Sequence, residues 1–101
     1  MKMQENILPA NRKETGMFNI LIVEDDYELR HLFQRVLIQN GYRVRGVEDG
    51  KAALEALEKE YADLIISDIM MPVMDGYELV RALRGSGIQT PVLMITAKDA
   101  F

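Results

Sequence analysis

The chain has 101 residues, a length that fits a single domain with one hydrophobic core. Its net charge is −4 and its Lys and Arg residues are not clustered, so we do not expect this segment to bind nucleic acid. No apolar run approaches the ~20 residues of a membrane span, and residues 1–16 lack the apolar core of a signal peptide. The absence of cysteine excludes disulfides and fits a reducing compartment, so we expect a cytoplasmic location.

Residues 1–16 are polar and mixed in charge, and they contain Pro9 and Gly16, which interrupt helices and strands. They show neither a helical nor a strand period. We therefore expect 1–16 to be a disordered tail or an upstream extension, with one domain over 17–101.

Four short segments from Phe18 onward have the patterns of strands. Residues 20–23, 64–66 and 92–95 are continuous apolar runs, which is typical of strands that are covered on both faces. Residues 42–45 alternate apolar and charged side chains, which favours a strand at the edge of the sheet.

Three segments with helical spacing of apolar residues separate these strands. Asp49 and Asp75 stand where they would cap the second and third helices. The positions expected to recur on the apolar faces are Leu29, Leu32, Phe33, Val36 and Leu37; Ala53, Leu54 and Leu57; and Leu79, Val80 and Leu83.

Alternating strands and helices indicate an α/β fold with a parallel sheet and right-handed crossovers. An edge position for the second strand favours a flavodoxin-like, doubly wound sheet with the strand order 2-1-3-4. That order leaves a place for a fifth strand beside the fourth. Because the chain ends at Phe101, we expect the fifth strand and the last helices to be missing.

Polar residues follow three of the predicted strands. Glu24 and Asp25 follow the first strand, Asp68 follows the third, and Thr96 follows the fourth. In open parallel sheets, ligands bind outside the carboxyl ends of the strands. We therefore expect three carboxylates and one hydroxyl to converge on one crevice.

Mutual repulsion among three carboxylates is relieved by a hard divalent cation, and Mg²⁺ prefers such oxygen ligands. Mg²⁺ also neutralises the oxygens of a transferring phosphoryl group. Asp68 could itself be the nucleophile and become an aspartyl phosphate, to which Thr96 could donate a hydrogen bond. An alternative for Glu24 and Asp25 is a favourable interaction with a helix dipole, which needs no metal. His31, the one histidine, lies off the apolar stripe and is expected on the surface.

Three segments resemble, in order and spacing, the signature blocks of receiver domains of two-component response regulators. They are I-L-I-V-E-D-D at 20–26, D-L-I-I-S-D-I-M-M-P-V-M-D-G at 63–76 and P-V-L-M-I-T-A at 91–97. The resemblance covers residues 18–101. It implies that Asp68 is the phosphorylated aspartate and that Glu24 and Asp25 surround Mg²⁺, with Asp25 a direct ligand. It also implies that the backbone carbonyl of Met70 ligates the metal and that Thr96 contacts the phosphoryl group.

The function implied by the resemblance is that of a signalling phosphoacceptor, which takes a phosphoryl group from a histidine kinase in a Mg²⁺-dependent reaction. Such a domain assists its own phosphorylation and dephosphorylation and is not otherwise an enzyme. The family's lysine and aromatic switch residue on the fifth strand have no counterpart in the 101 residues. Lys98 is expected to be a solvated loop residue and not a substitute for that lysine.

Three alternatives remain beside this interpretation. A haloacid dehalogenase type of hydrolase needs a D-x-D-x-T-like run after the first strand, and a flavodoxin needs a Ser/Thr/Gly-rich phosphate loop there. Neither pattern is present in residues 24–27. The third alternative is a non-catalytic receiver fragment that cannot be stably phosphorylated. We also expect self-association through an exposed edge of the fourth strand.

Overall fold

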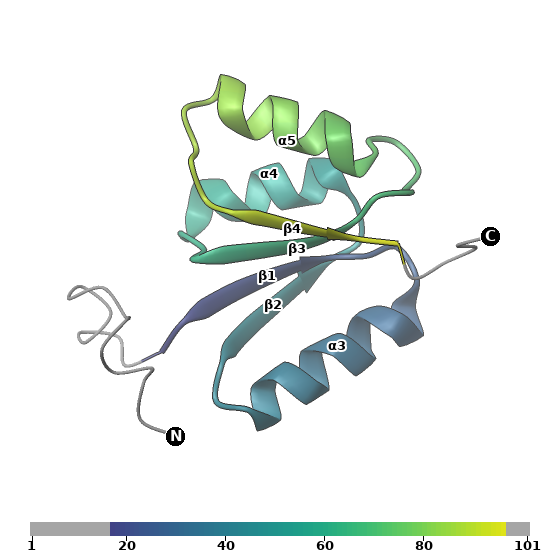
Figure 1. Cartoon of the computed structure of the whole chain (residues 1–101), viewed down its shortest axis with the longest axis vertical. Coiled ribbons are helices and arrows are strands. Elements are labelled where there is room, and N and C mark those ends of the chain that lie inside the picture. The colour runs from purple at the N-terminus through teal and green to yellow at the C-terminus, as the bar shows by residue number, and fades with distance from the viewer. Residues whose placement is uncertain (1–16, 97–101) are drawn as a thin grey trace.

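The computed structural model describes residues 17–96, which form one parallel sheet with helices on both faces (Figure 1). In chain order, the elements are β1 (Asn19–Val23), α3 (Tyr27–Gln39), β2 (Arg43–Val47), α4 (Gly50–Lys59), β3 (Leu64–Asp68), α5 (Gly76–Gly85) and β4 (Val92–Ile95). The four strands lie in the order β2-β1-β3-β4. This order confirms the α/β fold and the strand order predicted from the sequence.

The central strand β1 sets the direction of its neighbours, because it pairs in parallel with both β2 and β3. Ile22 of β1, for example, is paired with Gly46 of β2 and with Ile66 of β3. The carboxyl ends of all the strands therefore lie along the same side of the sheet, perpendicular to its two edge strands. The second strand lies at the opposite side of the sheet from β4, as its alternating charges predicted.

The main hydrophobic core lies between the sheet and the helices α4 and α5, which cover one face (Figure 1). Leu21, Ile65, Leu79 and Leu83 are each fully buried there. Their side chains meet because strand residues alternate between the two faces of the sheet, whereas the helices contribute positions three or four residues apart. Ala53 is also buried, and Leu54 and Leu57 pack against this core, as predicted for the second helix. In the third helix the prediction holds for Leu79 and Leu83, whereas Val80 is only half-buried.

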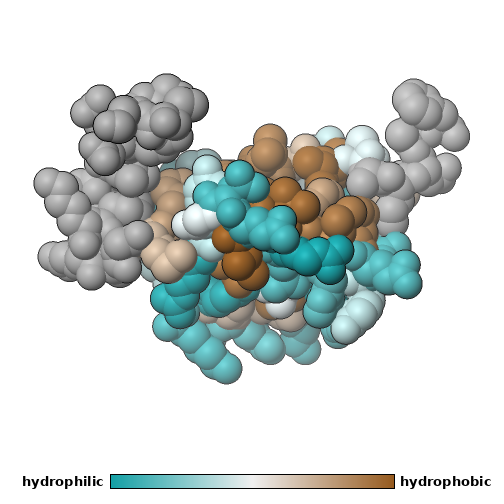
Figure 2. Space-filling model, turned by 90° about the horizontal axis from the view of Figure 1, so that it is seen from below, coloured by the Kyte–Doolittle hydropathy of each residue, from teal (hydrophilic) through white to brown (hydrophobic). Residues whose placement is uncertain are grey.

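The other face carries α3, which lies below β1 and β2 in Figure 1. Leu32 and Val36 of this helix are each 45% exposed, so the predicted apolar stripe is only partly covered. The reason is that no second helix lies beside α3 among residues 17–96. Figure 2 views the molecule from this side and shows hydrophobic residues, in brown, gathered next to hydrophilic ones, in teal. None of the helices in the described range is both long and apolar enough to cross a bilayer.

An aspartate caps the N-terminus of each helix. Asp49 accepts a hydrogen bond from the amide of Ala52 at 2.8 Å, and Asp75 accepts one from the amide of Glu78 at 2.8 Å. The caps predicted at these two positions are therefore present. Asp26 caps α3, which the sequence analysis did not predict. Each cap satisfies an amide that the helix itself leaves without a partner, and so fixes where each loop ends.

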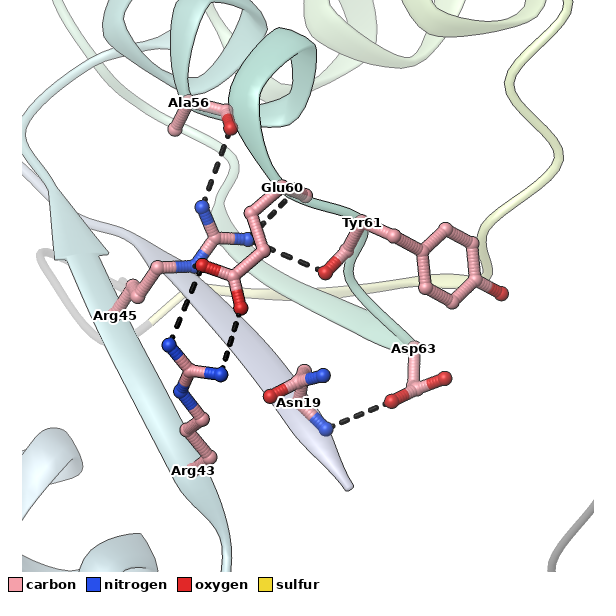
Figure 3. A network of polar contacts seen from close by, with 7 residues as sticks. All are labelled: Asn19, Arg43, Arg45, Ala56, Glu60, Tyr61 and Asp63. Carbon is pink, nitrogen blue, oxygen red and sulfur yellow. Dashed lines mark hydrogen bonds and ion pairs between the residues drawn. The ribbon is translucent and has the colours of Figure 1, made fainter. Parts of the chain in front are cut away.

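A network of polar contacts joins the C-terminal end of α4 to the edge strand β2 (Figure 3). The Arg45 guanidinium donates to the backbone carbonyls of Ala56 at 3.2 Å and Glu60 at 3.0 Å. Arg43 forms an ion pair with the Glu60 carboxylate at 2.9 Å. A cation at the C-terminal end of a helix interacts favourably with its carbonyl dipoles. The charged residues that marked β2 as an edge strand thus also hold α4 in place.

The strand β4 lies at the other edge of the sheet. It pairs with β3 on one side and has no strand on its other side among the residues described. Its sequence from Val92 to Ile95 contains no charge, and Leu93 is 53% exposed. An apolar edge with open backbone groups favours pairing with another chain.

We predict that the 101-residue chain self-associates through this edge, and that Leu93→Lys reduces the association because a charge on the edge disfavours strand pairing. Light scattering over a concentration series measures the effect. Leu32→Lys is the control, because Leu32 is also exposed and apolar but lies on α3. A monodisperse parent chain, or an equal effect of the two substitutions, would contradict the prediction.

Candidate functional site

The carboxyl ends of β1, β3 and β4 bring the predicted site residues to one edge of the sheet. Glu24 and Asp25 follow β1, Asp68 is the last residue of β3, and Thr96 follows β4. In the sheet register, Asp68 is paired with Ile95, the residue directly before Thr96. The convergence that the strand order predicted is therefore built into the sheet.

Three carboxylates meet at this edge. One oxygen from each of Glu24, Asp25 and Asp68 lies within 4.8 Å of the other two. Glu24 is 1% exposed and Asp68 is 0% exposed, whereas Asp25 is exposed to solvent. Two of the three carboxylates, those of Glu24 and Asp68, are therefore buried, and the third, that of Asp25, lies at the surface.

This set of donors fits Mg²⁺. The ion takes oxygen ligands at ~2.1 Å in octahedral geometry, so two bound oxygens lie roughly 3 to 4 Å apart. The three carboxylate oxygens, within 4.8 Å of one another, need to approach by no more than about 2 Å to share one ion. The open side next to Asp25 leaves room for the waters that Mg²⁺ retains.

The turn between β1 and α3 holds Glu24 through both its backbone and its side chain. The Glu24 amide donates to the carbonyl of Val47 in β2 at 3.0 Å. Its carboxylate oxygen Oε2 accepts from the amide of Asp26 at 2.9 Å, while the Asp26 carboxylate accepts from the amide of Leu29 at 3.1 Å. The three consecutive acids thus have different positions: Glu24 supports the turn, Asp26 caps α3, and Asp25 lies between them at the surface.

Asp68 is anchored by the elements on either side of it. Its oxygen Oδ1 accepts a hydrogen bond from the amide of Met70 at 3.2 Å. The next residue, Ile69, donates its amide to Ile95 of β4 at 2.9 Å and accepts from the amide of Gly76 at 2.8 Å. The end of β3 is therefore tied both to its neighbouring strand and to the first residue of α5.

The loop between β3 and α5 depends on two unusual backbone positions. Val73 has a φ of 73°, a conformation that is strained for a β-branched residue. At Gly76, an added Cβ would lie 2.9 Å from the Asp68 carbonyl oxygen and 2.9 Å from the Met94 sulfur. The sequence predicted Asp75 as a cap but not the strain at position 73, because Val73 carries no turn signal.

The remaining predicted residues are placed as follows. Met70 has an exposed side chain, and its amide contacts Asp68, whereas metal binding by its carbonyl stays a prediction. Thr96 is exposed at the end of β4. His31 is exposed, as predicted, with its ring 4.1 Å from the ring of Tyr27. Lys98 lies outside the described residues.

Comparison of the sequence with known proteins finds similarity over most of the chain. A family model described as response regulator receiver domain matches residues 20–101. The response regulator MprA of Mycobacterium tuberculosis is 42% identical over 81 residues, which are 80% of this chain and 35% of MprA. The transcriptional regulatory protein PcoR of Escherichia coli is 43% identical over 83 residues, which are 82% of this chain and 37% of PcoR. The chain thus spans about a third of the length of these relatives.

Solved structures show the same similarity in three dimensions. The chemotaxis protein CheY4 of Vibrio cholerae superposes with a TM-score of 0.77 at 38% identity, over 83% of this chain and 72% of CheY4. The N-terminal domain of a response regulator receiver protein from Methanoculleus marisnigri gives a TM-score of 0.75 at 36% identity, over 83% of this chain and 70% of that domain. Both values indicate a common fold with detectable sequence relationship.

We predict that Gly76→Ala destabilises the chain by about 1–3 kcal/mol, because the methyl group would collide with the Asp68 carbonyl oxygen and with Met94. Gly85→Ala is the control in the same helix. A Cβ at Gly85 would meet nothing within 4 Å, so alanine there should be neutral or stabilising by up to ~1 kcal/mol. Denaturant unfolding measures the change in stability of both variants. Equal changes would show that the close approach at Gly76 does not affect stability.

Proposed function

The chain belongs to the response regulator receiver domain family, and from this premise we propose that it accepts a phosphoryl group from a histidine kinase on Asp68. The observation that carries the proposal is the meeting of three carboxylates within 4.8 Å at the end of β1 and β3. Among them, Asp68 ends a strand and caps none of the helices described, so its position does not follow from helix capping.

Asp68 is the proposed nucleophile. In the transfer, one of its carboxylate oxygens bonds to phosphorus while the bond from phosphorus to the kinase histidine nitrogen breaks. The imidazole leaves with the electron pair of that bond. The amide of Met70 holds Oδ1 at 3.2 Å, which restricts rotation of the carboxylate and so orients the attacking group.

Glu24, Asp25, Asp68 and the backbone carbonyl of Met70 are the proposed ligands of Mg²⁺. When bound, the ion neutralises negative charge on the oxygens of the phosphoryl group. Asp25 is the ligand on the solvent side of the ion, because it alone of the three carboxylates is exposed. Glu24 contributes from inside, where its position is fixed by the Asp26 amide.

Thr96 is proposed to donate its hydroxyl to a phosphoryl oxygen. Support comes from the register, in which the residue before it is the partner of Asp68. The proposal describes a signalling domain that assists only its own phosphorylation and dephosphorylation. A cytoplasmic location also stays a prediction.

For the metal, we predict that Asp25→Asn and Asp68→Asn each weaken Mg²⁺ binding by on the order of tenfold or more, since each removes a charged ligand. Calorimetric titration of the 101-residue chain provides the dissociation constants. Glu58→Gln is the matched control, because it removes one negative charge from an exposed position near the C-terminal end of α4. Unchanged binding in both site variants would refute the metal assignment.

For phosphoryl transfer, we predict that phosphoramidate labels the chain only at Asp68 and only with Mg²⁺ present. Asp68→Ala should abolish the label. Thr96→Ala should slow labelling on the order of tenfold, equivalent to one charge-assisted hydrogen bond of ~1.5 kcal/mol. Mass spectrometry after digestion locates the label. Label that survives Asp68→Ala would refute the acceptor, and complete absence of label would favour the non-catalytic receiver fragment.

A further inference from the structure

A positively charged side chain reaches the acidic turn from α3. Arg30 lies in the first turn of this helix, and its nitrogen Nη1 donates to the backbone carbonyl oxygen of Glu24 at 2.7 Å. The contact is partly buried. We propose that Arg30 is a positioning residue, which fixes the peptide between Glu24 and Asp25 and thereby aims the Asp25 carboxylate at the metal. This inference rests on the metal site of the proposed function.

The Glu24 carbonyl matters because of the covalent structure around it. Its oxygen belongs to the planar peptide unit that joins Glu24 to Asp25. Holding that oxygen fixes the plane, and the plane fixes the direction in which the Asp25 backbone leaves the strand. The amide on the other side of Glu24 is held by the Val47 carbonyl at 3.0 Å. Both backbone groups of Glu24 are therefore fixed, one by β2 and the other by Arg30.

Arg30 is itself held in place at both its backbone and its side chain. Its backbone amide donates to the Asp26 carbonyl at 2.9 Å, and its guanidinium carbon lies 5.5 Å from the centre of the Tyr27 ring. A Cβ at Gly46 would lie 3.1 Å from Cγ of Arg30 and would collide with Oε1 of Gln34. Glycine at position 46 of the strand thus leaves the space in which the stem of Arg30 lies over β2.

The proposal can be separated from a simple effect of charge. Arg30 is a cation near a cation site, so an effect through charge alone would make its removal strengthen metal binding. An effect through positioning makes removal weaken binding. The two ions Mg²⁺ and Ca²⁺ give a second distinction, because Mg²⁺ demands near-ideal octahedral geometry, whereas Ca²⁺ accepts irregular sites. Loss of positioning should therefore weaken Mg²⁺ more than Ca²⁺.

The test is calorimetric titration of the 101-residue chain with Mg²⁺ and with Ca²⁺, comparing the parent chain with Arg30→Met and Arg30→Lys. We expect Arg30→Met to weaken Mg²⁺ about tenfold, in the range found for residues that orient metal ligands, and to weaken Ca²⁺ less. Arg30→Lys keeps the charge and one donor and should lie between the parent and Arg30→Met. Arg35→Met, which removes an equal charge from an exposed position of α3, should change neither ion.

Two further measurements complete the test. In the Asp25→Asn background, Arg30→Met should have no additional effect, because Arg30 is proposed to act through Asp25. Thermal unfolding without metal shows whether each variant folds. If Arg30→Met does not fold, Arg30→Lys is compared with the parent chain in its place. Tighter or unchanged Mg²⁺ binding in the Arg30 variants, or equal weakening of both ions, would overturn the inference while leaving the metal site intact. Failure of the parent chain to bind Mg²⁺ would overturn both.

Discussion

Parallel pairing of β1 with β3 places two buried carboxylates side by side. Val23 is paired with Ser67, so the residues that follow, Glu24 and Asp68, emerge next to each other. At a separation of up to 4.8 Å, two unit charges repel by roughly 3 kcal/mol in the effective dielectric of a protein. The register cannot shift to relieve this repulsion, because a shift of one residue would turn the buried apolar residues of both strands to the opposite face.

The core therefore determines where the charges stand. Leu21 of β1 and Ile65 of β3 are fully buried and paired with each other, which sets the register three residues before Glu24 and Asp68. The amides of Asp26 and Met70 donate to Glu24 and Asp68 and offset part of the repulsion. A cation offsets more of it than neutral donors do, which explains in energetic terms why this edge of the sheet suits Mg²⁺.

Much of this arrangement could be predicted from the sequence, because it depends on local patterns. Continuous apolar runs identified the strands β1, β3 and β4, although no residue of β4 is buried, and the alternation at 42–45 identified the edge strand β2. Asp49 and Asp75 stand directly before segments with helical spacing of apolar residues and were found as caps. The position of Asp68 followed from the strand order, since parallel strands end at a common edge.

Other features could not be predicted, for identifiable physical reasons. Asp25 and Asp26 both precede α3 and aspartate is a preferred cap, so only the geometry of the turn selects Asp26. Helical spacing predicted an apolar stripe that includes Leu32, but spacing does not reveal how much of a stripe the neighbouring elements cover. The positive φ of Val73 had no signal, because valine disfavours that conformation. The close approach at Gly46 was missed because the predicted strand ended at residue 45, whereas β2 continues to Val47 and includes this glycine.

The two loops that form the site are held with different firmness. In the turn after β1, Glu24 is fixed at its amide, its carboxylate and its carbonyl. In the loop after β3, Val73 is 78% exposed and keeps a strained backbone. Strain of this kind persists only where surrounding contacts impose it. Across Val73, the amide of Met74 donates to the Pro72 carbonyl at 2.7 Å. Ile69 directly follows Asp68 and is bonded to Ile95 and Gly76, so a single residue joins Asp68 both to β4 and to the start of α5.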